Sequence, residues 1–488
     1  MSEEELQTEE LQTTEEDTRE RFIPIGKQEI VADLLAAPHW SAEEQQQFGE
    51  FCKIFAALYH YKFHSHLEKI KRCYTPFNPD MDIVTQHKCS DEEKQEYHQT
   101  FLNEMRKLLN NANYEELTVD DINNAINADP YYGVKVSVDL EDFADMITYY
   151  RGASTKVEYK RTWTSLFLSK KRFEIPIYKR IFFLLKFKTE DERVEDILRR
   201  QKEEWEKAQK EESEKAQKEE SEKTGETGEV ENQDALSKAQ NLENAEKEVW
   251  DEDKQRKWEK KARKKIQKSR RNLPDGLSEE DVFIKLFKNI PRTDLEMLFP
   301  NQNVQLKMFD KIKLAITGGG GTIGGLWSTI SKVAVAANPI MLIIAFGSLI
   351  GIIFRQIMNI FMQRNKYMME LSRNLYFHNL DNNAGVINYL IDMAEEEESK
   401  EAVLAYYFLH TQHDKDYTKD ELDREIENYI QEKYGVAIDF EVEDGLRKLR
   451  KEGILIEKEE GILKVLDLHQ TCACLDKQWD AFFNPDEE

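Results

Sequence analysis

The sequence predicts an α+β N-terminal domain with a long charged helical or disordered insert, a membrane helix and a C-terminal winged-helix-like domain. Three observations support this fold class. Helical periodicity gives way to strand-rich segments before Glu190, a run of 22 residues without a charge lies at Val333–Phe354, and three helical segments precede a hairpin near the C-terminus. With 488 residues, the chain is long enough for two or three domains with cores of their own.

Composition limits the classes of partner. A formal charge of −26 repels nucleic acid and anionic surfaces unless basic residues cluster locally. Five cysteines without a CxxC pair favour a reducing compartment. Residues 1–19, which are mostly Glu, Gln and Thr, are predicted to be disordered and carry no signal or transit-peptide features, so we expect an internal segment to direct membrane insertion.

The N-terminal α+β domain is expected over residues 20–189 and 276–313. Ser41, with Glu44 three positions later, forms a capping box and opens a helix that ends at Thr75-Pro76. Further helices are expected at Glu92–Leu109 and Val119–Asn127. Segments rich in Val, Ile, Tyr and Phe predict strands at Gly133–Leu140, Lys156–Thr162, Arg172–Lys188 and Val282–Phe287. Pro176 predicts that the third of these is bent or lies at an edge.

Residues 190–275 form a charged low-complexity insert. The string EKAQKEES occurs twice in tandem, which predicts either disorder or a solvent-bridging helix with i,i+4 ion pairs. Lys254–Arg271 then carries eleven basic residues against one Glu. Such a segment is typical either of a solvated helix or of one that lies on anionic lipid headgroups. The residues expected to contact lipid are Trp258, Lys260, Lys261, Arg263, Lys264 and Lys265.

The membrane segment is expected over residues 314–354. Val333–Phe354 has the length and apolarity of a membrane helix, because roughly 20 apolar residues cross a hydrocarbon core. The Gly-rich segment Leu314–Ile330 is either a linker or the first pass of a two-helix hairpin. Basic residues flank both ends, which favours a hairpin with both domains in the cytoplasm. Gly347 and Gly351 form a GxxxG motif, expected to pack helices and to allow self-association.

Residues 355–398 are expected to be a juxtamembrane helical region that ends near Asn382-Asn383, and residues 399–488 a winged-helix-like domain. The three helices of that domain are predicted at Glu401–His410, opened by Ser399, at Lys419–Tyr434 and at Glu441–Glu452. Ile454–Glu457 and Ile462–Leu466 form the hairpin. The third helix carries Arg447, Lys448, Arg450 and Lys451, but acidic neighbours offset them. We therefore expect a protein partner here rather than nucleic acid.

No pattern predicts a cofactor or a nucleophile with its base. His60, His64 and His66 have spacings that allow metal binding on a helix, although aromatic neighbours favour packing. Asp381, Asp392 and the run Glu395–Glu398 offer carboxylates for a divalent ion, but a solvated acidic face fits them better. The sequence therefore assigns no catalytic, cofactor or metal residue.

Five strings resemble the transmembrane-protein-143-like family, which is catalogued as a domain of unknown function. They are RERFIPIGKQEIVADLL near the N-terminus, YTPFNPD at Tyr74–Asp80, KLFKNIPRTDLEMLFP at Lys285–Pro300, NLYFHNLDNNAG at Asn374–Gly385 and EEEESKEAVLAYYFL at Glu395–Leu409. The resemblance implies a membrane protein with two hydrophobic segments, mitochondrial in eukaryotes, and it implies no catalytic residue. Without a transit peptide, a bacterial member in the cytoplasmic or an internal membrane is expected.

Together these observations favour a non-enzymatic, membrane-anchored interaction protein of unknown biochemical activity, with its main domains in the cytoplasm. Its expected partners are the lipid bilayer, proteins at the winged-helix-like domain and a second copy through the membrane helix. The alternative is a metal-dependent membrane enzyme or factor that uses the His60–His66 or Asp381–Glu398 region.

Overall fold

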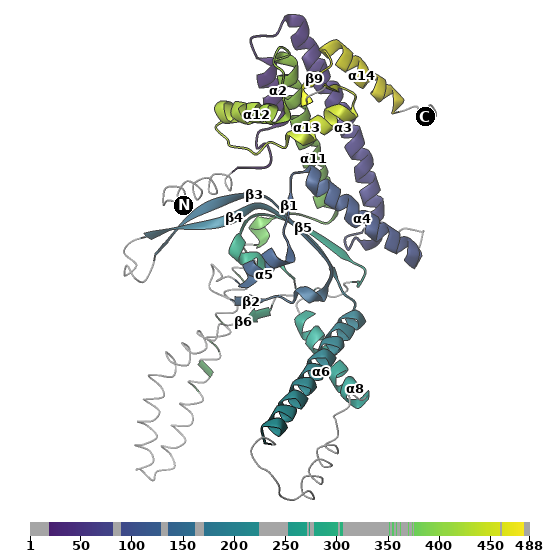
Figure 1. The fold of residues 1–488 in the computed structure, drawn as a ribbon, viewed down its shortest axis with the longest axis vertical. Coiled ribbons are helices and arrows are strands. Elements are labelled where there is room, and N and C mark those ends of the chain that lie inside the picture. The colour runs from purple at the N-terminus through teal and green to yellow at the C-terminus, as the bar shows by residue number, and fades with distance from the viewer. Residues whose placement is uncertain are drawn as a thin grey trace, which may run out of the picture.

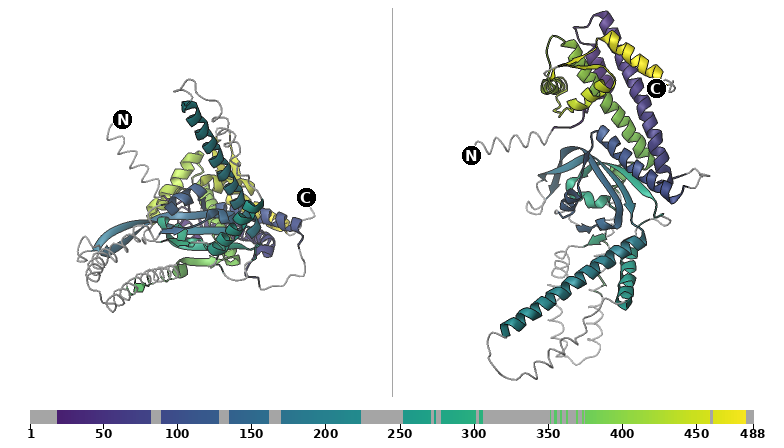
Figure 2. Two further views of the ribbon diagram at one scale, coloured as in Figure 1. Left: turned by 90° about the horizontal axis from the view of Figure 1, so that it is seen from below. Right: turned by 45° about the vertical axis from the view of Figure 1, so that its right-hand side comes forward.

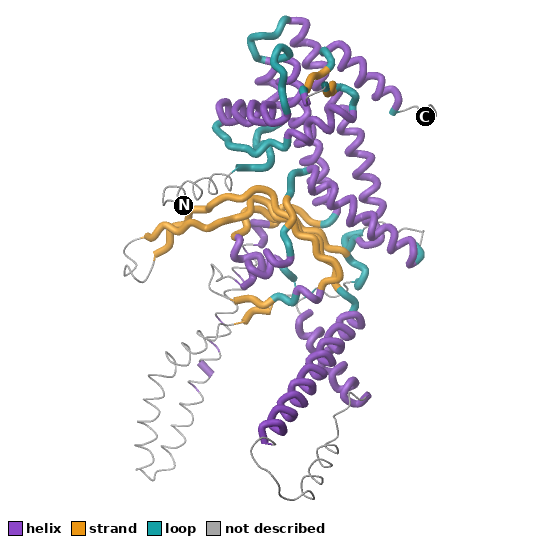
Figure 3. The backbone as a smooth tube through the Cα atoms, viewed as in Figure 1, coloured by secondary structure: helices purple, strands orange, loops and turns teal. Residues whose placement is uncertain are grey.

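The computed structural model describes residues 19–81, 89–127, 135–161, 170–223, 252–270, 278–300, 303–305, 375–458 and 461–482, together with a few single positions between 273 and 373. The described part is a mixed helix and antiparallel-sheet fold, which confirms the α+β prediction. Helices gather above a curved sheet and a pair of helices extends below it (Figure 1 and Figure 3).

The central sheet has five strands in the order β1-β3-β4-β5-β7, and every neighbouring pair is antiparallel. The strands are β1 (Glu115–Glu116), β3 (Phe143–Arg161), β4 (Lys170–Phe187), β5 (Val282–Pro291) and β7 (Asn379–Asn382). At Pro176 the strand β4 pairs only with β3, because its pairing with β5 begins at Ile177. Pro176 therefore lies at a local edge, where a missing N–H costs no ladder bond, as predicted.

One face of this sheet is covered by long helices (Figure 2). These are α3 (Ala42–Tyr74), α4 (Asp91–Asn111) and α11 (Ala384–Thr411), with the short helix η1 (Thr75–Phe77) after α3, and the shorter α2 (Lys27–Leu35) packs on α3 and α11. Ser41 and Glu44 form the predicted capping box of α3. The stripe Phe48, Phe51 and Phe55 is completely buried against α11 and neighbouring helices. Burial of this apolar stripe is what holds the helical layer together.

The described residues cover the other face of the sheet only in part. Here lie α5 (Val119–Asn127), η5 (Arg292–Leu298), η2 (Leu140–Asp142) and a two-stranded ribbon of β2 (Lys135–Ser137) and β6 (Asn303–Gln305). A second core cluster, which includes Ile181, Phe183 and Phe299, fills the space between them and the sheet. The two faces of the sheet therefore contribute to separate cores.

The described parts of the charged insert are helical. Helices α6 (Glu190–Lys223) and α8 (Glu252–Ser269) pack together below the sheet through the buried residues Val194, Ala262 and Ile266 (Figure 1). Of the two predicted alternatives, helix is correct for these ranges, while the segment between them, with Gly225 and Gly228, lies outside the described residues.

The C-terminal part contains α12 (Lys419–Tyr434), α13 (Val442–Lys451), β8 (Leu455–Glu457), β9 (Leu463–Val465) and α14 (Leu468–Ala481). Three helices followed by a hairpin match the predicted winged-helix arrangement. Its first helix, however, is the whole of α11, and Ser399 lies inside that helix with its hydroxyl bonded to the carbonyl of Glu395. Residues 379–382, expected to end a helix, instead form β7, because they complete the edge of the sheet beside β5.

The membrane helix of the predicted fold class is not supported. No helix within the described ranges is both long and apolar enough to cross a membrane. The longest of them, α3 and α6, carry charged residues along their length, which a hydrocarbon core disfavours. This finding overturns the predicted membrane helix and the membrane localisation that depended on it. Residues 314–350 lie outside the described residues, and of the expected span only Gly351 and Phe354 are described.

Candidate functional site

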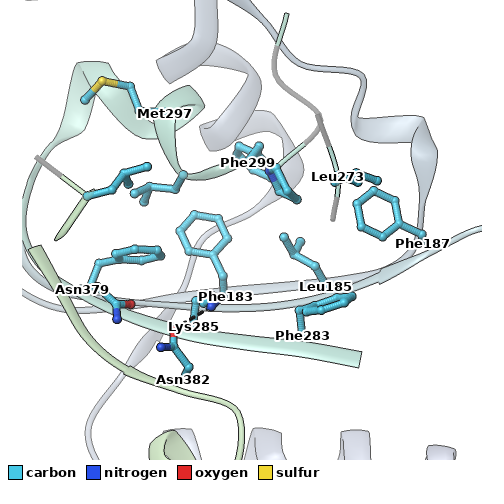
Figure 4. A pocket seen from close by; sticks show the side chains of 14 residues that line it. Phe183, Leu185, Phe187, Leu273, Phe283, Lys285, Met297, Phe299, Asn379 and Asn382 are labelled. Atoms are coloured by element: carbon cyan, nitrogen blue, oxygen red, sulfur yellow. Dashed lines mark hydrogen bonds between the residues drawn. The ribbon is translucent and has the colours of Figure 1, made fainter. Parts of the chain in front are cut away.

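The partly covered face of the sheet contains a cavity of about 400 Å³, which we call the sheet pocket. Its lining residues are Phe183, Leu185, Phe187, Leu273, Phe283, Lys285, Phe287, Met297, Leu298, Phe299, Pro300, Leu375, Asn379 and Asn382. Figure 4 shows the aromatic and aliphatic side chains converging on this space from the sheet below and from η5 above. A cavity of this size and composition suits a small apolar ligand.

Strand alternation places these side chains. Along β5, Val282, Ile284 and Leu286 face the helical layer and belong to its core, while Phe283, Lys285 and Phe287 line the pocket on the opposite face. Strand β4 repeats the pattern with its own aromatic residues. Sequence reasoning identified both strands but did not separate their two faces, because strands buried on both faces show a continuous apolar run.

The polar end of the sheet pocket is formed by Lys285, Asn382 and Asn379. The ammonium of Lys285 donates a hydrogen bond of 2.8 Å to the side-chain oxygen of Asn382 (Figure 4). Burial lowers the pKa of Lys285, and the carboxylate of Asp80 opposes that shift. Among the described residues, no ion pair joins the Lys285 ammonium to a carboxylate, and Asp80 acts on it only as a more distant charge. A partly buried cation without an ion-pair partner at the end of an apolar cavity is a feature that packing alone does not require.

Elsewhere, Glu398, Glu401 and Lys448 form a group between α11 and α13 that we call the buried charge cluster. The Lys448 ammonium bonds Glu401 and lies 3.1 Å from Glu398, and all three side chains are at most 7 % exposed. Burial raises the pKa of Glu401 to about 7, although Lys448 opposes this shift. The cluster borders a cavity of about 340 Å³. Because its cation already has two carboxylate partners, we assign the cluster to the packing of α13 on α11.

The three histidines expected as alternative metal ligands point to separate partners. His60 Nδ1 lies 2.8 Å from Glu395, His66 Nε2 lies 2.7 Å from Glu104, and His64 is exposed. Burial lowers the pKa of His66, and Glu104 opposes that shift. Within the described ranges, no group of three or more His, Cys, Asp or Glu side chains could hold a metal ion.

The acidic run Glu395–Glu398 is not the solvated face that was predicted. Glu397 is 2 % exposed and accepts hydrogen bonds from Arg151 at 2.8 Å and from Lys400 at 2.6 Å. It also accepts a hydrogen bond from the backbone N–H of Ile23. The run therefore joins α11 to β3 and to the N-terminal segment, and sequence reasoning missed it because its partners lie far away in the chain.

The residues expected to contact lipid lie on α8. Arg263 is paired with Glu190, Asp191 and Glu259, and Trp258 is partly buried beneath the ammonium of Lys261. The remaining lysines of the predicted set are exposed: Lys260, Lys264 and Lys265. Lipid contact by these residues stays a prediction.

Of the predicted GxxxG pair, Gly347 lies outside the described residues. A Cβ added at Gly351 would meet nothing within 4 Å, so no described atom packs against that glycine. Self-association through this pair also stays a prediction.

The fold and the sheet pocket define a class: an antiparallel α+β domain that offers an apolar cavity on the face away from its helical layer. Residues 143–385 match the sequence model of the family described as "Protein of unknown function (DUF3754)". That range contains every residue that lines the sheet pocket. The description supports a domain of unknown function, as the resemblance implied, and it supports neither the transmembrane-protein-143-like name nor a membrane location. No solved structure matches this chain.

Proposed function

We propose that this chain is a binding protein whose sheet pocket takes up a small, predominantly apolar molecule. One observation carries the proposal: a cavity of about 400 Å³ lined by five phenylalanines lies within the range of the family match. Removing apolar surface from water contributes about 25 cal/mol per Å². A ligand that fills this cavity would therefore gain most of its affinity from burial.

The test uses the full chain and an uncharged fluorescent probe, N-phenyl-1-naphthylamine, titrated against it. Leu375 lies at the pocket and is only partly buried, so Leu375→Trp would occupy space there with little effect on the core. We expect about tenfold weaker probe binding, since overpacking costs about 1–3 kcal/mol and about 1.4 kcal/mol corresponds to tenfold.

Val157→Trp is the matched control, because Val157 is 39 % exposed on β3 and does not line the pocket. This variant should bind the probe as the parent chain does. Failure of the parent chain to bind the probe, or equal binding by both tryptophan variants, would reject the sheet pocket as the site.

We also propose that the winged-helix-like domain contacts a protein rather than nucleic acid. On α13, Arg447 is paired with Asp444 and Arg450 with Glu457, so these guanidinium groups already have carboxylate partners. A gel shift of the full chain with duplex DNA at low salt tests the choice. A shift that Arg450→Gln abolishes would contradict this proposal.

A further inference from the structure

We infer that the molecule held in the sheet pocket carries a carboxylate and that Lys285, with Asn382 beside it, binds that group. The ligand class is then a single-chain carboxylate amphiphile. This inference depends on the proposed function, because it names the polar end of the ligand that the sheet pocket would hold.

Among the described residues that line the sheet pocket, Lys285 is the only charged one, and the other side chains are apolar except for two asparagines. Its neighbours on the same face of β5 are Phe283 and Phe287, so its ammonium stands at the border of an aromatic surface (Figure 4). An amphiphile places its polar group at such a border and its chain over the aromatic rings.

Lys285 donates one hydrogen bond, to Asn382, and an ammonium has three donors to satisfy. Within the described part of the chain, no carboxylate forms an ion pair with it, and the charge of Asp80 acts on it from a greater distance. Taking a cation partly out of water without a partner is costly, and an incoming carboxylate would compensate it with a charge-assisted hydrogen bond. A neutral or cationic head group would leave that cost in place.

Two asparagines add hydrogen-bond donors at the same end of the sheet pocket. Asn382 lies opposite Lys285 in the β5–β7 pairing, and Asn379 lies opposite Phe287 across a register shift. Both line the pocket beside the lysine. Each side chain carries an NH₂ group that can donate to a second carboxylate oxygen, which neither an alcohol nor an ammonium head group would use as well.

The experiment compares decanoate, decanol and decyltrimethylammonium as competitors for the uncharged probe on the full chain. The three have nearly the same alkyl chain, which is one carbon shorter in decanoate, so a preference for decanoate cannot come from a longer apolar chain. We expect decanoate to displace the probe at about tenfold lower concentration than decanol, as a hydrogen bond to a charged group predicts. Decyltrimethylammonium should be the weakest competitor.

Lys285→Gln keeps a hydrogen-bonding side chain near Asn382 and removes the charge. It should abolish the preference for decanoate over decanol, whatever its effect on the affinity for the probe. Lys288→Gln, on the same strand but outside the pocket lining, is the matched control and should keep the preference.

The outcomes separate the two proposals. If the probe does not bind the parent chain, the proposed function fails. If the probe binds but decanol competes as well as decanoate, or if Lys285→Gln keeps the preference, the pocket stands and the carboxylate inference is overturned. If Lys285→Gln fails to fold, the comparison of the three head groups on the parent chain still tests the carboxylate inference.

Discussion

At the scale of single residues, the buried charge cluster pairs one ammonium, that of Lys448, with the two carboxylates of Glu398 and Glu401. Lys448 is 3 % exposed, and burial would lower its pKa, but Glu401 and Glu398 raise it. The ammonium therefore stays charged in the folded protein. Its removal would leave two acidic groups in the interior without a cation.

Lys448→Met is accordingly expected to lower the free energy of unfolding by about 3–5 kcal/mol, the usual effect of removing one partner of a buried pair. Urea unfolding of the full chain measures it. Lys451→Met, which changes an exposed lysine of the same helix, should stay within about 0.5 kcal/mol of the parent chain. If both variants lose the same free energy of unfolding, the buried charge cluster contributes no more to stability than an exposed lysine does.

The pH dependence of stability follows from Glu401. Burial raises its pKa from 4.5 to about 7 in the folded chain, so folding favours the protonated acid. The resulting stability is complete below the unfolded pKa and is lost as the pH rises through the folded pKa. Between about pH 5 and about pH 8 the free energy of unfolding should fall, and Glu401→Gln should reduce that fall by about 1–3 kcal/mol.

Chemical denaturation at several pH values tests this expectation. Burial also raises the pKa of Glu296 and of Asp423 to about 7, so some slope should remain in the variant. A variant that has the slope of the parent chain would show that Glu401 is ionised throughout this range.

These residues also show where sequence reasoning stops. The run Glu395–Glu398 has the composition of a solvated surface, and only its distant partners, such as Arg151 and Lys448, show that it is buried. The place of Lys285 in the sheet pocket was likewise not predicted, because a lysine within a strand pattern is usually exposed. Buried polar groups depend on partners that periodicity does not identify.

At the scale of elements, local signals predicted those helix ends that have a standard cap. The capping boxes at Ser41 and Thr418 begin α3 and α12, and Gly435 ends α12 in the left-handed conformation. The start of α11 was missed, since Asn383 adopts a positive φ of 48° and makes no side-chain cap. Helix ends with a standard cap could be predicted, and this one lacks such a cap.

The contact between α11 and α13 depends on a glycine. A Cβ added at Gly445 would lie 2.9 Å from the carbonyl oxygen of Glu401 and 3.3 Å from the Cβ of Ala405. Gly445→Ala should therefore lower the free energy of unfolding by about 1–3 kcal/mol, because overpacking outweighs the better helix propensity of alanine.

Gly49→Ala is the matched control, because Gly49 also lies within a helix and its added Cβ would meet only Leu35 at 3.8 Å. Thermal unfolding should show this variant at least as stable as the parent chain, by up to about 1 kcal/mol. A stabilised Gly445→Ala would mean that the two helices separate easily.

At the scale of the whole molecule, the α+β character could be predicted, but the order of strands could not. Strand β7 joins the sheet beside β5 although the two are far apart in the sequence, and a four-residue strand carries little pattern. The predicted membrane helix was wrong, although apolar length, flanking basic residues and the family resemblance had favoured it, because no described helix is long and apolar enough to cross a membrane. The sheet pocket was not predicted, since it arises only where β4, β5, η5 and β7 meet.

The prediction that residues 190–275 are an insertion depends on where the chain leaves the sheet and where it returns. Lys186 at the end of β4 pairs with Val282 at the start of β5, so the chain leaves and re-enters the sheet at neighbouring positions. The base of the insert is tied to the sheet domain by Arg193, which lies 2.6 Å from Asp139, and by Arg270, which lies 2.7 Å from Asp142. Arg200 on α6 also pairs with Glu141, and Val194, Ala262 and Ile266 pack α6 against α8.

Replacing residues 203–257 with a short Gly/Ser linker should therefore leave the free energy of unfolding within about 1 kcal/mol, because linker length adds little loop entropy. The uncharged probe should bind the shortened chain with unchanged affinity. Removing residues 190–277 should cost more, since Arg193 and Arg270 are then lost and Asp142, which is 1 % exposed, stays buried without them. If the shorter replacement already abolishes cooperative unfolding or probe binding, the insert is part of the domain's core.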